Sequence, residues 1–316
     1  MWQAEVAIPT MHLRQMKNFI KIIAIVSSLA IILILTQSKW MVPLQIFNHR
    51  HERDCISVLL QRTNSMITKM SWHHAMLKQL RHLQVYYRPI VCKYQDRFDT
   101  LKTLTTFVDI LEREKIPYFM YGGTLLGSYR HMGMIMWDDD LDIMMNATDK
   151  LRIRRALLKQ RPEYGLEWKH FIRQWKFWLN SHNREHVPSK PWKWPYVDMF
   201  FFRENSTHIW DEITFYSDNV YKKSDVFPLS RRPFENLMLY APRNTSAVLE
   251  KTTILDDCMS AEMSHKTEEL FNMQKTIPCS ELEEFYPFTK RRVLPSGGEE
   301  EMLMYRNKVL KTFTPS

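Results

Sequence analysis

The sequence predicts an α+β domain with a mixed sheet flanked by helices, preceded by one N-terminal transmembrane helix. Three observations predict this architecture. Residues 22–38 carry no charge and, with Phe19 and Ile20, come close to the ~20 residues that cross a bilayer. Apolar residues recur at helical steps after Phe98, and short aromatic runs further along are typical of strands. The 45% hydrophobic content over 316 residues suits a packed core.

The apolar stretch at residues 19–38 is predicted to be a retained signal anchor. Arg14, Lys17 and Lys21 precede its uncharged part at residues 22–38, and no small-x-small cleavage pattern follows it. Residues 1–18 then form a cytoplasmic tail. The protein is then expected to be a single-pass type II protein, with the rest of the chain in the lumen of the Golgi or the ER. A cleaved signal peptide is the alternative.

Sequons and cysteines fit a lumenal domain. Of the three Asn-x-Ser/Thr triplets, those at Asn205 and Asn244 are expected to be glycosylated, whereas Asn146 lies too close to a run of aspartates. The four cysteines are compatible with two disulfides in any of three pairings, and the absence of a CxxC motif argues against a structural zinc site. The cysteines are Cys55, Cys92, Cys258 and Cys279.

Residues 39–95 are rich in His, Arg, Gln and Ser and are predicted to form a stem, with a helical extension of the domain as the alternative. The catalytic domain is expected at residues 96–316. Its first element is an amphipathic helix, marked by apolar residues from Phe98 to Leu111 and ended by Pro117.

Short apolar runs predict the strands that follow, and Asn244 and Thr245 open a further helix. The segment 256–284 is expected to be helical, and the segment 295–301 to be an exposed turn or loop. The expected strands are residues 118–121, 135–145, 196–202, 208–216 and 237–240.

The aspartates in WDDDLD, from Trp137 to Asp142, are the main candidates for chemistry. In an extended segment, Asp138, Asp140 and Asp142 point to one side, while Asp139 points to the other. Such carboxylates repel one another, and a divalent cation neutralises them. Oxygen ligands favour Mg²⁺ or Mn²⁺ over zinc, with Asp138 as a reserve ligand. An acidic surface loop is the alternative.

Asp198 interrupts the apolar run YVDMFFF and is the best candidate for a third carboxylate on a neighbouring strand. The alternative is a buried aspartate paired with an arginine or with backbone amides.

Two glycine-containing segments precede the aspartates. Gly122–Gly123 and Gly127–Ser128 both offer backbone amides to a phosphate at a helix start. Eleven residues separate Ser128 from Asp140, so a turn at Gly127–Ser128 can face the acidic strand. Arg130 and His131 lie between them as candidate ligands for phosphate oxygens.

The stretch YGGTLLGSYRHMGMIMWDDDLDIMM, at residues 121–145, resembles the signature of the LicD family, which includes bacterial phosphorylcholine transferases, fukutin and fukutin-related protein. GTLLG, the following Arg-His, the Trp and the Asp-x-Asp occur in register. WPYVDMFFF and the segment 225–251 are similar to later family blocks, so the resemblance covers about residues 95–255.

This resemblance implies a nucleotidyltransferase-like fold in which a Gly-Ser turn and an Asp-x-Asp strand bind metal and nucleotide, with a third Asp on the next strand. In this sequence, the turn corresponds to Gly127–Ser128 or else to Gly122–Gly123. The Asp-x-Asp strand corresponds to Asp140 and Asp142, and the third aspartate to Asp198. The implied activity moves a phosphorylated alcohol, such as phosphocholine or ribitol phosphate, from a CDP-linked donor to a glycan hydroxyl.

Two other functions stay open, an Asp-x-Asp glycosyltransferase that uses UDP-sugars and a catalytically silent partner of a glycan or transferase. The net charge of +9 suits nucleic acid, an anionic membrane or a phosphorylated substrate. No nucleic-acid-binding motif is present, and the anchor argues against that partner. Tryptophans between Trp168 and Trp194 could stack on a base or sugar, or simply pack in the core.

Overall fold

A computed structural model of the chain describes residues 83–91, 94–169, 174–182, 184–213, 219–295 and 297–315. All of them belong to one compact unit, Glu52–Ser316. The expected tail, anchor and residues 39–82 of the expected stem lie outside the described residues, as do Cys55 and Cys92. In the described part of the chain, no helix is long and apolar enough to cross a membrane.

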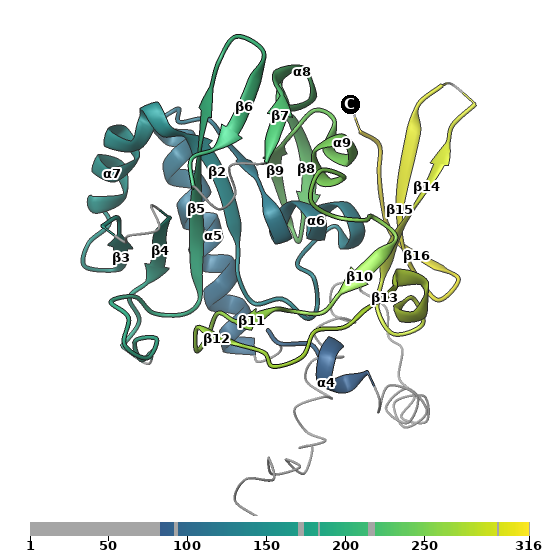
Figure 1. Ribbon diagram of the computed structural model, residues 1–316, viewed down its shortest axis with the longest axis horizontal. Helices are drawn as coiled ribbons and strands as arrows, with labels where there is room; N and C mark the ends of the chain where they lie inside the picture. The colour runs from purple at the N-terminus through teal and green to yellow at the C-terminus, as the bar shows by residue number, and fades with distance from the viewer. Residues whose placement is uncertain are drawn as a thin grey trace, which may run out of the picture. The chain divides into compact units, whose positions relative to one another are not determined.

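A seven-stranded mixed sheet forms the centre of the unit (Figure 1). Its main path runs β1-β2-β5-β4-β3, with β6 paired to the second half of β5 and β7 paired to β6. Only β2 and β5 are parallel to each other, and the other pairs in this sheet are antiparallel. The strands are β1 Tyr118–Met120, β2 Asp142–Asn146, β3 Tyr164–Glu167, β4 Trp175–Leu179, β5 Tyr196–Glu204, β6 His208–Asp211 and β7 Val220–Lys222.

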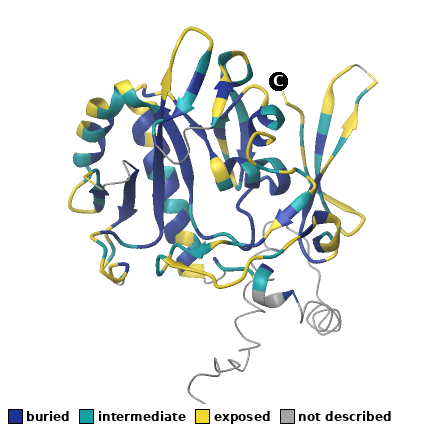
Figure 2. Ribbon diagram, viewed as in Figure 1, coloured by how far each residue is buried: buried dark blue, intermediate teal, exposed yellow. Residues whose placement is uncertain are grey.

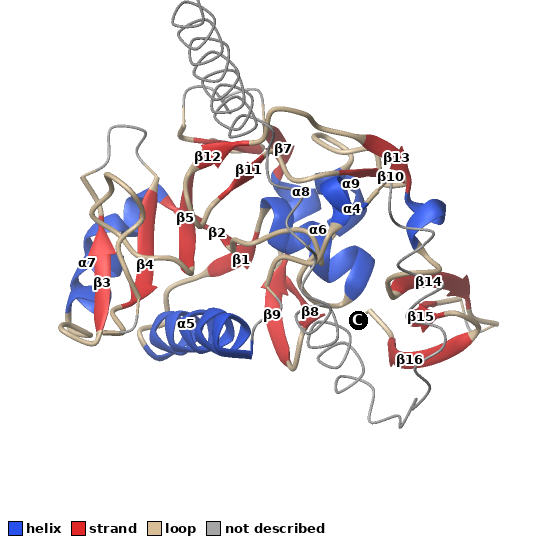
Figure 3. Cartoon of the chain, turned by 90° about the horizontal axis from the view of Figure 1, so that it is seen from below, coloured by secondary structure: helices blue, strands red, loops and turns tan. Residues whose placement is uncertain are grey.

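Helix α5 (Tyr94–Arg113) packs against β4 and β5 and lies along one face of the sheet (Figure 3). The helix predicted from Phe98 is therefore confirmed, with a start four residues earlier. Its apolar stripe, which includes Phe107 and Leu111, is buried in the main core. Helix α7 (Lys150–Leu158) packs beside it, and α4 (Gln84–Tyr87) is a single turn before it.

The central strands are buried along most of their length (Figure 2). β5 is buried from Tyr196 to Phe202, as its nearly continuous apolar run predicted. Strands 118–121, 196–202 and 237–240 are confirmed within a residue or two, and strand 208–216 is shorter than expected.

Helix α6 (Gly122–His131) connects the sheet to the rest of the unit, since it packs on β2, the β8–β9 hairpin and α9. Helix α9 begins as predicted, with the Asn244 side chain accepting a hydrogen bond from the Ala247 amide. The remaining elements here are α8 Lys223–Val226, β8 Ser230–Phe234, β9 Leu237–Ala241 and α9 Thr245–Leu249.

The expectation of a helix over residues 256–284 is wrong. Cys258 and Cys279 are joined by a disulfide that brings their Cα atoms to 4.9 Å across 21 residues, whereas a helix of that length is ~30 Å long. The segment instead forms two small hairpins and a 3-10 turn. These elements are β10 Asp257–Met259 with β13 Thr276–Pro278, β11 Met263–Ser264 with β12 Glu269–Leu270, and the turn Cys279–Leu282.

The chain ends in a three-stranded antiparallel sheet, β14 (Phe288–Val293), β15 (Glu299–Tyr305) and β16 (Lys308–Phe313). The expected exposed loop is part of this hairpin, but β15 already begins at Glu299. Arg232 of β8 forms a buried ion pair with Glu301 of β15 and so ties this sheet to the rest of the unit.

Candidate active site

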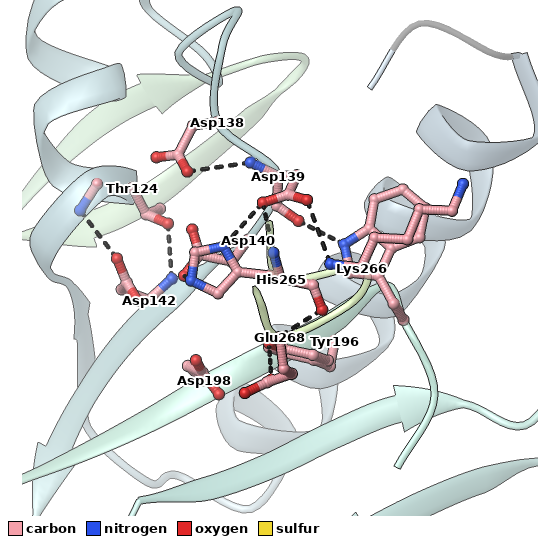
Figure 4. Close-up of polar contacts among 12 residues, drawn as sticks. Thr124, Asp138, Asp139, Asp140, Asp142, Tyr196, Asp198, His265, Lys266 and Glu268 are labelled. Carbon is pink, nitrogen blue, oxygen red and sulfur yellow. Dashed lines mark hydrogen bonds and ion pairs between the residues drawn. The ribbon is translucent and has the colours of Figure 1, made fainter. Parts of the chain in front are cut away.

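Three of the predicted aspartates meet at the start of the two parallel strands. Asp142 is the first residue of β2 and lies opposite Asp198 of β5 in the strand register. Asp140 comes from the loop just before β2. Carboxylate oxygens of the three residues lie within 4.8 Å of one another, and Asp142 and Asp198 are buried. These residues are called the carboxylate cluster below (Figure 4).

The loop that carries the aspartates is not the strand expected at residues 135–145, because β2 begins only at Asp142. The indole N–H groups of two tryptophans hold this loop in place. Trp137 Nε1 donates to the Met259 carbonyl at 2.9 Å, and Trp194 Nε1 donates to the Asp139 carbonyl at 2.7 Å. The segment before Asp142 is therefore a loop, but Asp138 still lies beside Asp140 while Asp139 bonds to His265.

The N-terminus of helix α6 lies against the cluster. The Gly123 amide donates to Asp142 Oδ2 at 2.8 Å, and the Asp142 amide donates to Thr124 Oγ1 at 2.7 Å. Gly122 has φ +46°, and a Cβ there would lie 2.5 Å from Asp142 Oδ2. A Cβ on Gly123 would lie 2.6 Å from Asp138 Oδ2. Gly122 thus needs glycine because of its positive φ, and a side chain at Gly123 would have to displace the Asp138 carboxylate.

The structure does not bring Gly127, Ser128, Arg130 or His131 to the cluster, which corrects the expected turn at Gly127–Ser128. Both residues lie inside α6, and a Cβ on Gly127 would meet the Gly133 carbonyl at 2.4 Å. Ser128 Oγ donates to the Pro233 carbonyl, and His131 Nδ1 lies 2.7 Å from the Pro287 carbonyl. These side chains serve packing between elements.

Arg130 is likewise buried away from the aspartates. Its guanidinium donates to the carbonyl oxygens of Ile254, Leu255 and Asp257 at 2.6 to 3.1 Å. Burial lowers the pKa of Arg130 to about 10, against the opposing effect of nearby acidic residues. Arg130 therefore does not lie where it was expected to bind a donor phosphate. Its guanidinium instead holds the backbone at the start of β10.

Burial and mutual repulsion dominate the electrostatics of the aspartates. Burial, followed by the charges of neighbouring aspartates, raises the pKa of Asp142 well above its usual range. The same two causes raise the pKa of Asp138. Burial raises the pKa of Asp198 to about 6, although Lys176 opposes this shift. Such a site favours a positive charge among the carboxylates.

Two cationic side chains at the cluster were not anticipated. Lys176 of β4 is opposite Asp198 in the strand register, and its Nζ donates to Asp198 Oδ1 at 2.7 Å. This ammonium group is buried and lies 3.8 Å from the centroid of the Tyr196 ring. Asp198 is thus also a buried, paired aspartate, as the alternative interpretation predicted, but its partner is a lysine rather than an arginine or backbone amides.

The second cation is His265, from the turn of the β11–β12 hairpin. Its Nδ1 lies 2.7 Å from Asp139 Oδ1 and its Nε2 lies 3.2 Å from Asp140 Oδ2 (Figure 4). Burial alone would lower the pKa of His265, but Asp140 and Asp139 outweigh burial and raise this pKa to about 11.

Sequence reasoning could have found one of these cations. A single lysine within the apolar strand WKFWL is a signal of the same kind as Asp198 within YVDMFFF. His265 gave no such signal, because it lies in a segment whose fold depends on the disulfide. Trp175, Trp178 and Trp192 belong to the core, which supports the packing interpretation of the tryptophan-rich run.

The carboxylate cluster fits a divalent cation with oxygen ligands, since it offers three carboxylates from two adjacent strands at ligating distance. Asp138, Asp139 and His265 form a second group whose ligand atoms lie within 4.8 Å. That group includes a histidine nitrogen, whereas all three ligand atoms of the carboxylate cluster are oxygens, so the carboxylate cluster is the better site for a hard divalent cation.

The predicted glycosylation sites Asn205 and Asn244 are exposed. Each side chain accepts hydrogen bonds from its own turn, Asn205 from the amides of Thr207 and His208. Glycosylation of either residue stays a prediction.

Comparison with known proteins gives a family for the segment that holds the cluster. Residues 115–244 match the family model described as LicD/FKTN/FKRP, nucleotidyltransferase domain. The lipopolysaccharide cholinephosphotransferase LicD of Haemophilus influenzae is 46% identical over 68 residues, which are 21% of this chain and 26% of that protein.

Two further relatives are uncharacterized proteins of Rickettsia. That of Rickettsia typhi is 26% identical over 182 residues, 56% of this chain and 50% of that protein. That of Rickettsia prowazekii is 25% identical over 182 residues, 56% of this chain and 60% of that protein. The chain thus matches about half the length of these two proteins, and His265 lies beyond the segment matched by the family model.

Proposed function

We propose that this chain, whose residues 115–244 match the model of the LicD/FKTN/FKRP nucleotidyltransferase domain family, transfers a phosphorylated alcohol from a CDP-linked donor to a glycan hydroxyl. The alcohol is of the phosphocholine or ribitol phosphate type. The observation that carries the proposal is the meeting of Asp140, Asp142 and Asp198 at one edge of the sheet. The similarity to a bacterial cholinephosphotransferase supports the donor class.

Asp140, Asp142 and Asp198 are proposed to hold Mg²⁺ or Mn²⁺, which their oxygen ligands favour over softer ions. When bound, the ion supplies positive charge that offsets the donor diphosphate and the charge that develops on the leaving nucleotide. The protein's part is to keep three carboxylates close together despite their repulsion. Hydrogen bonds from the Gly123 amide and the Lys176 ammonium do this for Asp142 and Asp198.

In the proposed reaction, the acceptor hydroxyl attacks the phosphorus that carries the alcohol, in line with the bridging oxygen. A new O–P bond forms, the bond from that phosphorus to the bridging oxygen breaks, and CMP leaves with the electron pair. Asp198 takes the hydroxyl proton. Asp198 is proposed for this role because it is a buried carboxylate of the cluster, and a carboxylate can act as a general base.

The proposal places this reaction in the secretory pathway, with a single-pass type II topology and a lumenal domain in the Golgi or ER. The uncharged apolar segment at residues 22–38 and the sequons support this placement. The Cys258–Cys279 disulfide supports an oxidising compartment as well. A glycan on a glycoprotein or glycolipid is the proposed acceptor.

The test incubates the full-length chain with CDP-choline, other CDP-alcohols and UDP-sugars in Mn²⁺ or Mg²⁺, and follows the nucleotide released. Release of CMP from a CDP-alcohol is expected. Release of UDP from a sugar donor would instead indicate a glycosyltransferase. Absence of release from every donor would favour a binding partner without catalysis.

A further inference from the structure

The turn at residues 265–268 reaches the carboxylate cluster from a part of the chain that the family match does not include. It joins β11 to β12 within the loop that the Cys258–Cys279 disulfide closes. Seen from below, this hairpin lies beside the ends of β2 and β5 (Figure 3).

His265 holds two neighbouring aspartates at once. Carboxylate oxygens accept hydrogen bonds, so Nδ1 of His265 donates to Asp139 at 2.7 Å, and Nε2 lies 3.2 Å from Asp140 Oδ2, the distance of an ion pair. Asp139 is fully buried and also accepts from the His265 and Lys266 amides. Asp139 therefore fixes the ring, and the ring fixes one oxygen of Asp140.

The other end of the turn is anchored independently. Glu268 Oε1 accepts hydrogen bonds from Tyr196 at 2.6 Å and from Trp192 at 3.2 Å, and lies 3.6 Å from Lys176 Nζ. These contacts keep the turn in place next to Asp198. The position of the imidazole is thus determined by the contacts of His265 with Asp139 and also by the contacts of Glu268 at the other end of the turn.

We propose that His265 is a positioning residue for the carboxylate cluster, which orients Asp140 so that its free oxygen joins Asp142 and Asp198 around a divalent cation. This inference rests on the proposed function for the metal site but not for the donor. Residues that hydrogen-bond a metal ligand raise metal affinity ~10- to 100-fold. Mn²⁺ binding is therefore the quantity that His265 controls.

The test measures the Mn²⁺ dissociation constant of the full-length chain by calorimetry or by Mn²⁺ electron paramagnetic resonance, without donor or acceptor. His265→Gln and His265→Asn form the decisive pair. The Gln amide nitrogen reaches the region of Nε2 and can still donate to Asp140. The shorter Asn amide reaches only the region of Nδ1 and Asp139. We expect Asn to weaken Mn²⁺ binding ~10-fold or more and Gln to weaken it ~3-fold or less.

Two further variants provide a control and a reference for the loss of a metal ligand. Lys266→Ala is the matched control, because its Nζ lies 3.7 Å from Asp96 and its amide bond to Asp139 is kept. We expect this variant to bind Mn²⁺ like the wild type. Asp140→Asn is the reference for loss of a ligand and should weaken binding at least as much as His265→Asn.

Equal Mn²⁺ affinity in the wild type and in a folded His265→Asn, alongside weak binding by Asp140→Asn, would overturn the role of His265 and leave the metal site intact. Equal losses for Gln and Asn would also overturn it, since they would indicate packing rather than donation to Asp140. Unchanged binding in Asp140→Asn would instead contradict the metal site of the proposed function.

Discussion

Lys176 and Asp198 face each other across the β4–β5 pair, and the lysine Nζ lies 2.7 Å from Asp198 Oδ1 with both side chains buried. One partner of a buried ion pair is costly to remove, because the other charge stays buried without compensation. This pair therefore affects both the stability of the site and the charge that a bound cation meets.

Lys176→Met should lower the free energy of unfolding by roughly 3 kcal/mol or more in the metal-free protein. Saturating Mn²⁺ should recover part of this loss, because a cation near Asp198 replaces the missing charge. Urea denaturation with EDTA and with Mn²⁺ measures both effects. Lys102→Met removes an exposed pair with Glu163 and should cost ~1 kcal/mol or less. Equal losses in the two variants would contradict this account.

The raised carboxyl pKa values predict how stability depends on pH. Asp198 has a pKa of about 6 in the folded protein, above the ~4 of an unfolded chain. The folded state therefore binds the proton more tightly. The resulting stability is complete below pH ~4 and is lost as pH rises through about 6.

In EDTA, the free energy of unfolding should fall between pH 5 and pH 7.5, by roughly 1.4 kcal/mol for Asp198 alone. Thermal or urea unfolding across this range measures the slope. Asp198→Asn should have a shallower slope, and saturating Mn²⁺ should flatten that of the wild type. An Asp198→Asn variant with the wild-type slope would show that this carboxyl does not carry the pH dependence.

Gly122→Ala should damage the site from the helix side. The position has φ +46°, and the added methyl would lie 2.5 Å from Asp142 Oδ2, so Asp142 must shift. We expect a loss of roughly 1 to 3 kcal/mol in stability together with weaker Mn²⁺ binding. Gly298→Ala, which meets no atom within 4 Å, is the control and should change neither quantity. Wild-type Mn²⁺ affinity in Gly122→Ala would be inconsistent with the observed packing.

Arg130→Met tests whether Arg130 stabilises the fold or binds the donor phosphate. Loss of the guanidinium leaves the buried carbonyl oxygens of residues 254, 255 and 257 without their donor, at a cost of roughly 2 to 4 kcal/mol. The donor KM of the folded protein should stay within ~2-fold of the wild type, because the side chain does not reach the cluster. Arg292→Met, at an exposed pair with Glu300, is the control for stability. A large rise in KM would restore the phosphate-binding role.

The sequence predicted the parts of the site that local pattern determines. The acidic run WDDDLD identified Asp140 and Asp142, and an aspartate within the apolar run YVDMFFF identified Asp198 on a neighbouring strand, which is where the strand register places it. The predicted phosphate-binding turn at Gly127–Ser128 was wrong. A glycine and its spacing from the aspartates do not distinguish a turn from a close contact inside a helix. There Gly127 is needed for packing against Gly133.

The remainder of the site depends on contacts between distant segments. His265 reaches Asp140 only because the Cys258–Cys279 disulfide closes its loop and Glu268 anchors the turn. Neither the pairing of these cysteines nor the position of the turn has a local pattern in the sequence. The expected helix at residues 256–284 failed for the same reason.

The most direct measurement is the rate of CMP release from a CDP-alcohol by the full-length protein with Mn²⁺, for the wild type, Asp198→Asn and Asp211→Asn. Asp211 is a suitable control, since it is also buried with a pKa raised by burial to about 6 but lies outside the cluster. We predict that Asp198→Asn lowers the rate at least ~100-fold without unfolding the protein, and that Asp211→Asn keeps it within ~3-fold. A folded Asp198→Asn that releases CMP at the wild-type rate would contradict the assignment of catalysis to the carboxylate cluster.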